Sequence, residues 1–470
     1  MKKMIRPVIA VFCAAVLILV SCDFPQGAGS DGNLTVVLPG GNSGRSALPN
    51  SFISTLRYII TLIGPGGTIE QESAGGSVTV SVEPGEWTIT VNAYDSAVLT
   101  GTGGETVTVV PGKPASVNIK MTVDPAYEAA LPVLYIHNEA DLRHCITAYG
   151  GSGKTFRLEN DISVSGLPAG TLGTGTTLDG QGHTITLAIN VDDSQAGLLG
   201  QNSGTVKNLR LAGTVSAAYS LATSSAGAVA GMNTGFGTIR NVRSTVTVTA
   251  SNYSTADLYT GGIAGENDGT IENCSSGGNV ISTTTGAMLH TGGIAGINSG
   301  SITQCYAWGN ITSSNSGNDG RTGGIAGNNF AGASITMCAA LNSEVRNGSP
   351  INNQGRIAGA DSGTLSGNFA YDLIRIGTQT GAVTSGVGPA AINGAALFGS
   401  ALATPGSTSK ALWTGDPTQL NWPSLEPGPS AGEPVSPASP WFWGNRTIAI
   451  PPNGIGGGLA TAYVPALWFE

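Results

Sequence analysis

The chain has 470 residues, with 20 basic and 29 acidic side chains and a formal net charge of −9. Charged residues make up only 10% of it, and the absence of a cationic stripe argues against a nucleic-acid partner. Glycine reaches 71 residues while 40% of the chain is apolar, which is typical of turn-rich β-structure rather than of disorder. The length allows two or three domains, each able to bury a core.

Residues 1–21 have the organisation of an export signal. Three basic residues lie among the first six, and the apolar run Val8–Val20 is shorter than the roughly 20 residues of a membrane-spanning helix. The run ends in Leu-Val-Ser-Cys, and this ending at Cys22 resembles the lipobox of bacterial lipoproteins. The resemblance implies that the signal is removed and that Cys22 carries several acyl chains, which hold a protein stably on a membrane.

Lipidation would leave a mature chain with 17 basic and 29 acidic side chains, a balance of −12. Residues 22–32 read as a short tether behind the lipid. We expect the outer membrane or the cell surface as the location, although Asp23 favours inner-membrane retention in enteric bacteria. The expected partners are the membrane, through the lipid, and a glycan or a protein of a host or cell surface.

Residues 33–123 are predicted to form a separate β-sandwich. Runs rich in Val, Ile and Thr alternate with Gly-Pro and Pro-Gly turn signals, and six or seven strands in about 90 residues suit two packed sheets. The run Pro84-Gly85-Glu86-Trp87 resembles Ig-like or prealbumin-like modules of exported bacterial proteins, which implies a fold and no activity. The predicted strands are Leu34–Leu38, Arg57–Leu62, Ser77–Val82, Trp87–Val91, Thr106–Val110 and Ala115–Ile119.

A linker, residues 124–132, precedes a predicted short helix. Asn138 can cap the start of this helix, and the Gly-Gly pair at 150–151 ends it. Such a helix ahead of stacked strands can cover the first open edge. Its apolar face consists of Leu142, Cys145 and Ile146.

One phrase recurs through residues 195–376. Its closest copies are GGIAGENDGTIENC from Gly261 and GGIAGINSGSITQC from Gly292, and successive closing glycines lie 31, 34, 31, 31 and 32 residues apart. A fixed period near 31 is typical of a chain that stacks one unit on the next. The closing glycines are Gly200, Gly231, Gly265, Gly296, Gly327 and Gly359.

These repeats resemble the GLUG motif of exported bacterial proteins, and TLDGQGHTITL from Thr177 resembles the coils that often precede such repeats. The resemblance implies an all-β protein in which residues 133–376 form a right-handed parallel β-helix, with GLUG-type repeats over 195–376. Surface or adhesion-associated roles follow from it only loosely. Six repeats and two opening coils, stacked at about 4.8 Å, would make a rod of about 40 Å.

Two columns of identical residues run through the repeats. Asparagine stands two residues after the first five closing glycines, and stacked asparagines can hydrogen-bond along the axis, so we predict a structural ladder. Its members are Asn202, Asn233, Asn267, Asn298 and Asn329, with Asp361 in the sixth unit. Cysteine occupies one position of three consecutive units, at Cys274, Cys305 and Cys338.

We favour free thiols packed as small hydrophobes for this column, because disulfides need particular geometry and no histidine shares its phase. Ile271 and Cys274 are both expected inside, yet they lie three residues apart, which simple strand alternation does not allow. A bend or bulge between them would reconcile the two, and the sequence leaves this open.

No pattern predicts a catalytic, cofactor or metal site. Glycoside hydrolysis needs paired carboxylates, but Glu266 and Asp268 correspond to Ile297 and Ser299 in the next unit, so no acidic column forms. An adhesion or binding scaffold is therefore the favoured function. A polysaccharide lyase or hydrolase on the β-helix face is the first alternative, and a structural spacer without a ligand is the second.

Tyr306 and Trp308 are the candidate ligand contacts. If Cys305 points inward, both aromatic rings point outward, where they could stack on sugar rings, although we favour the alternative that a loop covers them. Residues 377–470 form a Pro/Trp-rich segment that is predicted to cap the last edge of the β-helix and to bury its aromatic side chains there. Its tryptophans are Trp413, Trp422, Trp441, Trp443 and Trp468.

Overall fold

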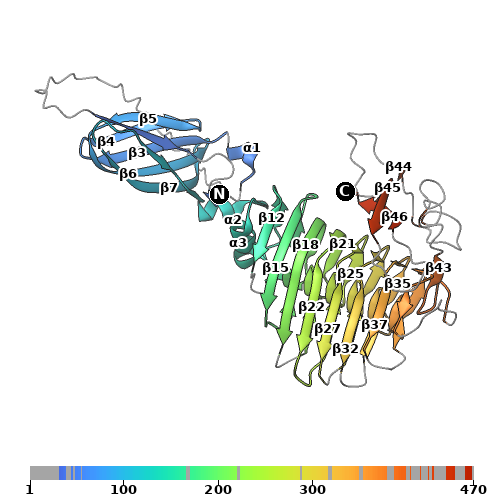
Figure 1. The fold of residues 1–470 in the computed structure, drawn as a ribbon. Helices are drawn as coiled ribbons and strands as arrows, with labels where there is room; N and C mark the ends of the chain where they lie inside the picture. The colour runs from blue at the N-terminus through green and yellow to red at the C-terminus, as the bar shows by residue number, and fades with distance from the viewer. Residues whose placement is uncertain are drawn as a thin grey trace, which may run out of the picture.

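The computed structural model describes residues 31–377, apart from short gaps at 39–43, 46–47, 54, 166–169, 220–222, 286–287, 316–319 and 349–352. Beyond these it describes residues 386–397 and several short pieces between 403 and 467. A β-rich domain at the N-terminal end is followed by a parallel β-solenoid, as Figure 1 shows. The predicted all-β fold, a β-helix behind a β-rich domain, is confirmed.

Two packed sheets form the N-terminal domain. The fully buried Trp87 lies in the core that they share, and its indole Nε1 donates a 2.8 Å hydrogen bond to the Glu83 carbonyl. Each of the six predicted runs overlaps a strand. The smaller sheet contains β5 (Ser77–Val82), β1 (Gly32–Val37) and β8 (Ala115–Asn118). The larger contains β2 (Gly44–Arg45), β9 (Met121–Val123), β7 (Val98–Val109), β6 (Gly85–Asp95), β3 (Arg57–Gly64) and β4 (Gly67–Ser73).

The hairpin strand β4 was missed by the sequence analysis because it is an edge strand with a polar sequence and a mostly exposed surface. Edge strands that face water on both sides carry no hydrophobic alternation. A single turn of helix, α1 (Asn50–Ile53), also belongs to this domain.

Two helices join the sandwich to the solenoid (Figure 1). The predicted helix is confirmed as α3 (Glu139–Tyr149), where the Asn138 side chain accepts from the Asp141 N–H at 3.1 Å. The predicted linker contains a second helix, α2 (Pro125–Ala130), which Asp124 caps. This helix escaped prediction because six residues are too few to show a helical period.

Three parallel sheets form the solenoid. The arch sheet contains β16 (Gln195–Ala196), β19 (Ser224–Ala226), β23 (Leu258–Gly261), β28 (Leu289–Gly292), β33 (Gly320–Gly323) and β38 (Gln354–Gly355). The asparagine sheet contains β13 (Thr171–Leu172), β17 (Leu199–Asn202), β20 (Ala230–Asn233), β24 (Ala264–Asn267), β29 (Ala295–Asn298), β34 (Ala326–Asn329) and β39 (Ala358–Asp361).

The wide sheet completes each coil and begins with the opening coils. Its first strands are β10 (Val133–Ile136), β11 (Thr155–Leu158), β12 (Ile162–Ser165), β14 (Thr177–Asp179), β15 (Thr184–Val191), β18 (Thr205–Tyr219), β21 (Thr238–Ser244) and β22 (Thr247–Asn252). It continues with β25 (Thr270–Glu272), β26 (Ser275–Ser276), β27 (Val280–Thr284), β30 (Ser301–Thr303), β31 (Tyr306–Ala307) and β32 (Ile311–Asn315). Its last strands are β35 (Ser334–Thr336), β36 (Ala339–Ala340), β37 (Glu344–Asn347), β40 (Thr364–Ser366), β41 (Phe369–Tyr371), β42 (Arg375–Ile376) and β43 (Ala395–Leu397).

A residue in the left-handed conformation bends the wide sheet once in every repeat. This bend explains how Ile271 and Cys274, three residues apart, can both face the core. Asn273 lies between them and has a φ of 53°, and the side chains of Ile271 and Cys274 are both fully buried. The left-handed conformation breaks the alternation, so two residues three apart can both face the core. The same position is left-handed in the neighbouring coils, at Asn208, Asn241, Gln304, Met337 and Gly367.

The C-terminal segment packs beside the solenoid, which corrects the predicted position of its tryptophans. Trp413, Trp422 and Trp441 are buried, but they lie against coils in the middle of the stack and not over its last edge. The sixth repeat is instead followed by β43, which extends the wide sheet beyond β41. A small sheet of β44 (Glu426–Pro427), β45 (Trp441–Ala449) and β46 (Thr461–Leu467) completes the segment (Figure 1).

Candidate functional site

The asparagine column is a continuous hydrogen-bonded ladder. Each side-chain Nδ2 donates to the Oδ1 of the next coil at 2.7 or 2.8 Å, and the five asparagines are fully buried. Asn329 ends the series by donating to Asp361 at 2.7 Å. Buried amides that satisfy one another leave no group for a ligand, so this column stabilises the stack. The members are Asn202, Asn233, Asn267, Asn298 and Asn329.

The cysteine column also serves packing. Cys274, Cys305 and Cys338 are buried free thiols, and Cys145 is buried in α3 and forms no disulfide. Burial, more than any neighbour, raises the pKa of the Cys305 and Cys338 thiols well above the ordinary value. A buried thiol that stays protonated is a poor nucleophile and a poor metal ligand. No group of three or more metal-binding side chains occurs among the residues that the structure describes.

Tyr306 and Trp308 are buried, so the pair is not an exposed ligand contact, and the favoured alternative of covered rings agrees with the structure. Tyr306 is fully buried and Trp308 is 6% exposed. The Tyr306 hydroxyl donates to the Pro465 carbonyl at 3.1 Å, and three tryptophans of the C-terminal segment surround its ring, with centroids 5.6 to 6.3 Å away. The covering chain thus comes from the other end of the sequence.

The C-terminal segment is held by polar contacts as well as by this aromatic cluster. The Trp441 indole donates to the Asn273 side chain at 3.0 Å, and the Trp422 indole donates to the Met337 carbonyl at 2.7 Å. Both acceptors are left-handed corner residues, two repeats apart. The C-terminal segment therefore contacts several coils along the side of the solenoid and connects them.

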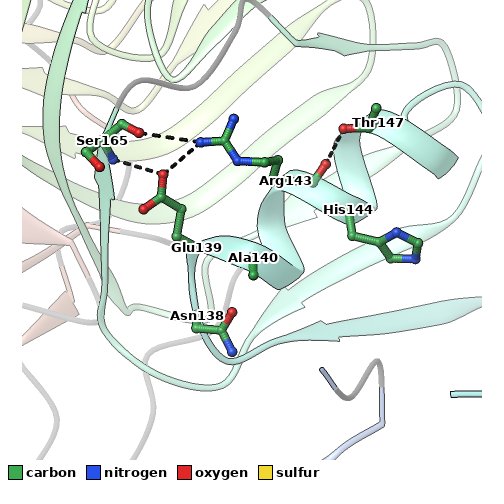
Figure 2. A pocket seen from close by; sticks show the side chains of 7 residues that line it. All are labelled: Asn138, Glu139, Ala140, Arg143, His144, Thr147 and Ser165. Carbon is green, nitrogen blue, oxygen red and sulfur yellow. Dashed lines mark hydrogen bonds and ion pairs between the residues drawn. The ribbon is translucent and has the colours of Figure 1, made fainter. Parts of the chain in front are cut away.

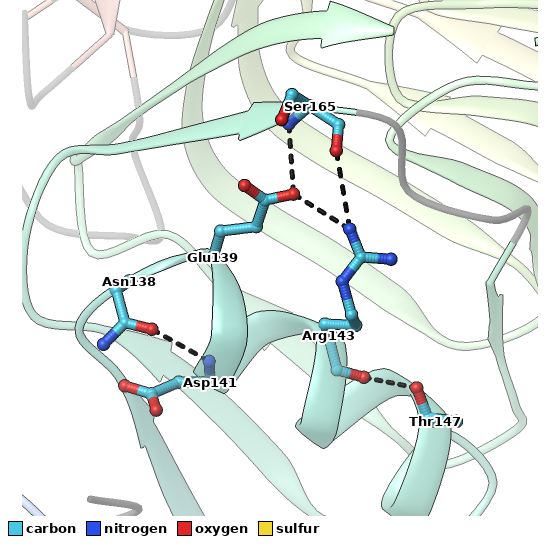
Figure 3. A network of polar contacts seen from close by, with 6 residues as sticks. All are labelled: Asn138, Glu139, Asp141, Arg143, Thr147 and Ser165. Carbon is cyan, nitrogen blue, oxygen red and sulfur yellow. Dashed lines mark hydrogen bonds and ion pairs between the residues drawn. The ribbon is translucent and has the colours of Figure 1, made fainter. Parts of the chain in front are cut away.

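An open hollow of about 770 Å³ lies beside α3 (Figure 2). Its polar groups already have partners: Glu139 accepts from Arg143 at 2.9 Å and from the Ser165 N–H at 3.1 Å, as Figure 3 shows. These contacts fasten α3 to β12, so we interpret them as structural. The lining residues are Asn138, Glu139, Ala140, Arg143, His144, Thr147 and Ser165.

The third coil and the adjoining strand of the fourth carry a cluster of titratable groups that the sequence analysis did not assemble. The Tyr259 hydroxyl donates to Asp257 at 3.1 Å, and the Tyr259 and His290 rings lie 5.4 Å apart. Burial, with a smaller contribution from Asp268, raises the pKa of Glu266 to about 7. Glu266 pairs in register with Met232 and Ile297, so the predicted absence of an acidic column holds at this position.

Comparisons with known proteins add a family motif and a distant structural likeness. The sequence model of the GLUG motif family matches residues 256–281, within the third repeat. A search of curated protein sequences finds no match. Among solved structures, the chain is similar to a "putative immunoglobulin A1 protease" from Bacteroides ovatus. The two share 21% sequence identity with a TM-score of 0.43, over 57% of this chain and 84% of that chain.

None of the helices among the described residues is long and apolar enough to span a membrane. Cys22, the predicted lipidation site, lies outside the described residues, as do the side chains of Trp443 and Trp468.

Proposed function

We propose that this protein is a lipoprotein that is anchored through Cys22 and displayed on a bacterial surface, where its solenoid serves as a binding scaffold. The order of the parts along the chain carries this proposal. Along the chain, Cys22 precedes β1, which begins at Gly32, and the N-terminal domain precedes the solenoid. A lipid at Cys22 would therefore be attached on the N-terminal side of both domains.

The roles of the repeated residues support a scaffold. The asparagines bond to one another, the cysteines are buried, and the glycines stand where a side chain would collide with a neighbouring backbone. At Gly296, for example, a Cβ would lie 2.5 Å from the Thr260 nitrogen. Because these columns are occupied by internal contacts, a ligand would be recognised through the outward positions that vary between coils.

Labelling and surface digestion test the anchor and the display. The full chain is expressed in a bacterium with two membranes and grown with radioactive palmitate. We expect label in the parent and none in Cys22→Ala, because only the lipobox cysteine is acylated. Cys13→Ala is the matched control, since this cysteine belongs to the signal run, and it should be labelled like the parent.

External protease should degrade the parent on intact cells while a periplasmic marker survives. Parent protein that carries no label would refute the anchor. Parent protein that is digested only after the outer membrane is permeabilised would refute surface display.

A further inference from the structure

Two outward columns meet on one side of the solenoid. In the arch sheet, Tyr259 pairs in register with Ser225 on one side and with His290 on the other. In the asparagine sheet, Glu266 pairs with Met232 and Ile297. The columns adjoin, because the Gln195 amide of the first lies 3.5 Å from the Met232 sulfur of the second.

Glycine makes this approach of the two sheets possible. A Cβ on Gly265 would lie 2.5 Å from the Ala226 nitrogen and 2.8 Å from the Ser225 Cβ. Contacts this short do not occur between real side chains and backbone, so only glycine allows the asparagine sheet to lie against the arch sheet. The strand that carries Glu266 is thereby brought close to the column that carries Tyr259.

His290 is the unexplained group at this meeting point. It is 1% exposed, and its ring Nδ1 has no hydrogen-bond partner among the residues that the structure describes. Buried polar atoms are nearly always paired, so an unpaired ring nitrogen is a candidate contact for a ligand hydroxyl. Its ring is tilted at 48° against the Tyr259 ring, which is itself only half-buried.

Protonation determines what this cluster can offer. Burial, with Arg321 as a smaller cause, lowers the pKa of His290 to about 3, so the imidazole is neutral at pH 7 and presents one donor and one acceptor. Glu266, with its pKa near 7, is about half protonated there and can donate as well as accept. The neighbouring charges are Asp257, Asp268 and Arg321.

The chemistry that fits is a ligand with many hydroxyl groups and no strong charge. A sugar ring can stack on Tyr259 while its hydroxyls donate and accept at Glu266 and near His290. Anionic ligands would meet the carboxylates of Asp257 and Asp268. The coils on either side of this pair lack the combination, because the arch-sheet column has Ser225 before Tyr259 and Arg321 after His290.

We propose that Tyr259 and Glu266 of the third repeat, together with His290 of the fourth, form a binding site for an uncharged saccharide. This inference rests on the proposed function as a binding scaffold and names the site and its ligand class.

Glycan arrays that carry neutral, acidic and amino sugars test the proposal with the detergent-solubilised full chain. We expect binding to neutral glycans and a loss of affinity of at least tenfold in Tyr259→Ala. Tyr253→Ala is the matched control, because this tyrosine is 67% exposed on a nearby loop and should leave binding unchanged. Thermal unfolding of each variant shows that the loss is not a loss of fold.

Glu266→Gln distinguishes a protonated carboxyl from a charged one. Glutamine copies the donor and acceptor of the protonated acid, so we expect binding within about threefold of the parent at pH 6. The affinity of the parent protein for the glycan should fall between pH 6 and pH 8, because Glu266 ionises in this range. The affinity of Glu266→Gln should not change with pH in the same range. Glu272→Gln, in the wide sheet of the same repeat, should retain the pH dependence of the parent.

Three results would overturn the proposal: no neutral glycan bound, acidic or amino sugars bound in preference, or equal losses in Tyr253→Ala and Tyr259→Ala. Each can occur in a protein that is labelled and digested at the cell surface, so failure of this site leaves anchoring and display standing.

Discussion

Substitution of Asn267 by alanine should destabilise the centre of the solenoid. Its Oδ1 accepts from Asn233 and its Nδ2 donates to Asn298, both at 2.7 Å. Alanine would leave the Asn298 oxygen without this donor, and the Asn233 amide would retain only longer contacts to backbone carbonyls. Each buried polar group left unsatisfied costs about 1–3 kcal/mol, so we expect a loss of about 2–6 kcal/mol in local stability.

Hydrogen exchange followed by mass spectrometry is the appropriate assay, because it reports opening of the coils separately from unfolding of the sandwich. Exchange in β24 and β29 should accelerate most, since each repeat is stabilised mainly by its immediate neighbours.

Asn329→Ala is the matched control at the end of the ladder. Asn329 donates to Asp361, which is exposed to water. Removal of the Asn329 side chain therefore leaves one buried ladder atom without its partner, whereas Asn267→Ala leaves two. The loss of stability should be about half as large. Equal and small effects below about 1 kcal/mol at both positions would refute the argument that the ladder stabilises the stack.

Three further predictions concern other parts of the solenoid. Arg356→Ala should destabilise the last coils by about 2–6 kcal/mol, measured by the same exchange experiment, because the buried guanidinium donates to two backbone carbonyls at 3.2 and 3.3 Å. Tyr306→Phe removes only the hydroxyl that bonds to Pro465, so proteolysis should release the C-terminal segment faster while β24 exchanges as in the parent. Burial lowers the pKa of His290 to about 3, so the folded protein loses stability as the pH falls from 6.5 towards 3 and this histidine must take up a proton. In His290→Gln the thermal unfolding midpoint should therefore fall less steeply over this pH range.

Periodicity made the scaffold predictable. A column such as Asn267 and Asn298 appears in the sequence as a repeat, and stacking turns sequence period into spatial contact. Helix α3 was predictable for the same kind of reason, since its cap at Asn138 and its apolar face are local signals. The burial and the partners of residues outside these patterns were harder to predict, because such residues contact segments that lie at no fixed separation in the sequence.

Burial of Tyr306 illustrates this limit. Strand alternation places the side chain outside its own coil, but its partner Pro465 lies 159 residues later, in a segment without a repeat. The Tyr259 cluster escaped for a related reason. The sequence period reveals residues of one column, whereas Tyr259 and Glu266 belong to two columns. These columns adjoin only because Gly265 has no side chain to hold the two sheets apart.

Comparison of inward and outward columns within the chain indicates where specificity can develop. The inward ladder keeps asparagine in five successive coils, because a single change leaves two neighbours unsatisfied. The outward arch-sheet column changes from coil to coil, and nothing in the stacking requires a particular residue there. A solenoid of this kind can therefore acquire a binding site by substitution at outward positions of one coil without loss of its fold. The outward column reads Gln195, Ser225, Tyr259, His290 and Arg321.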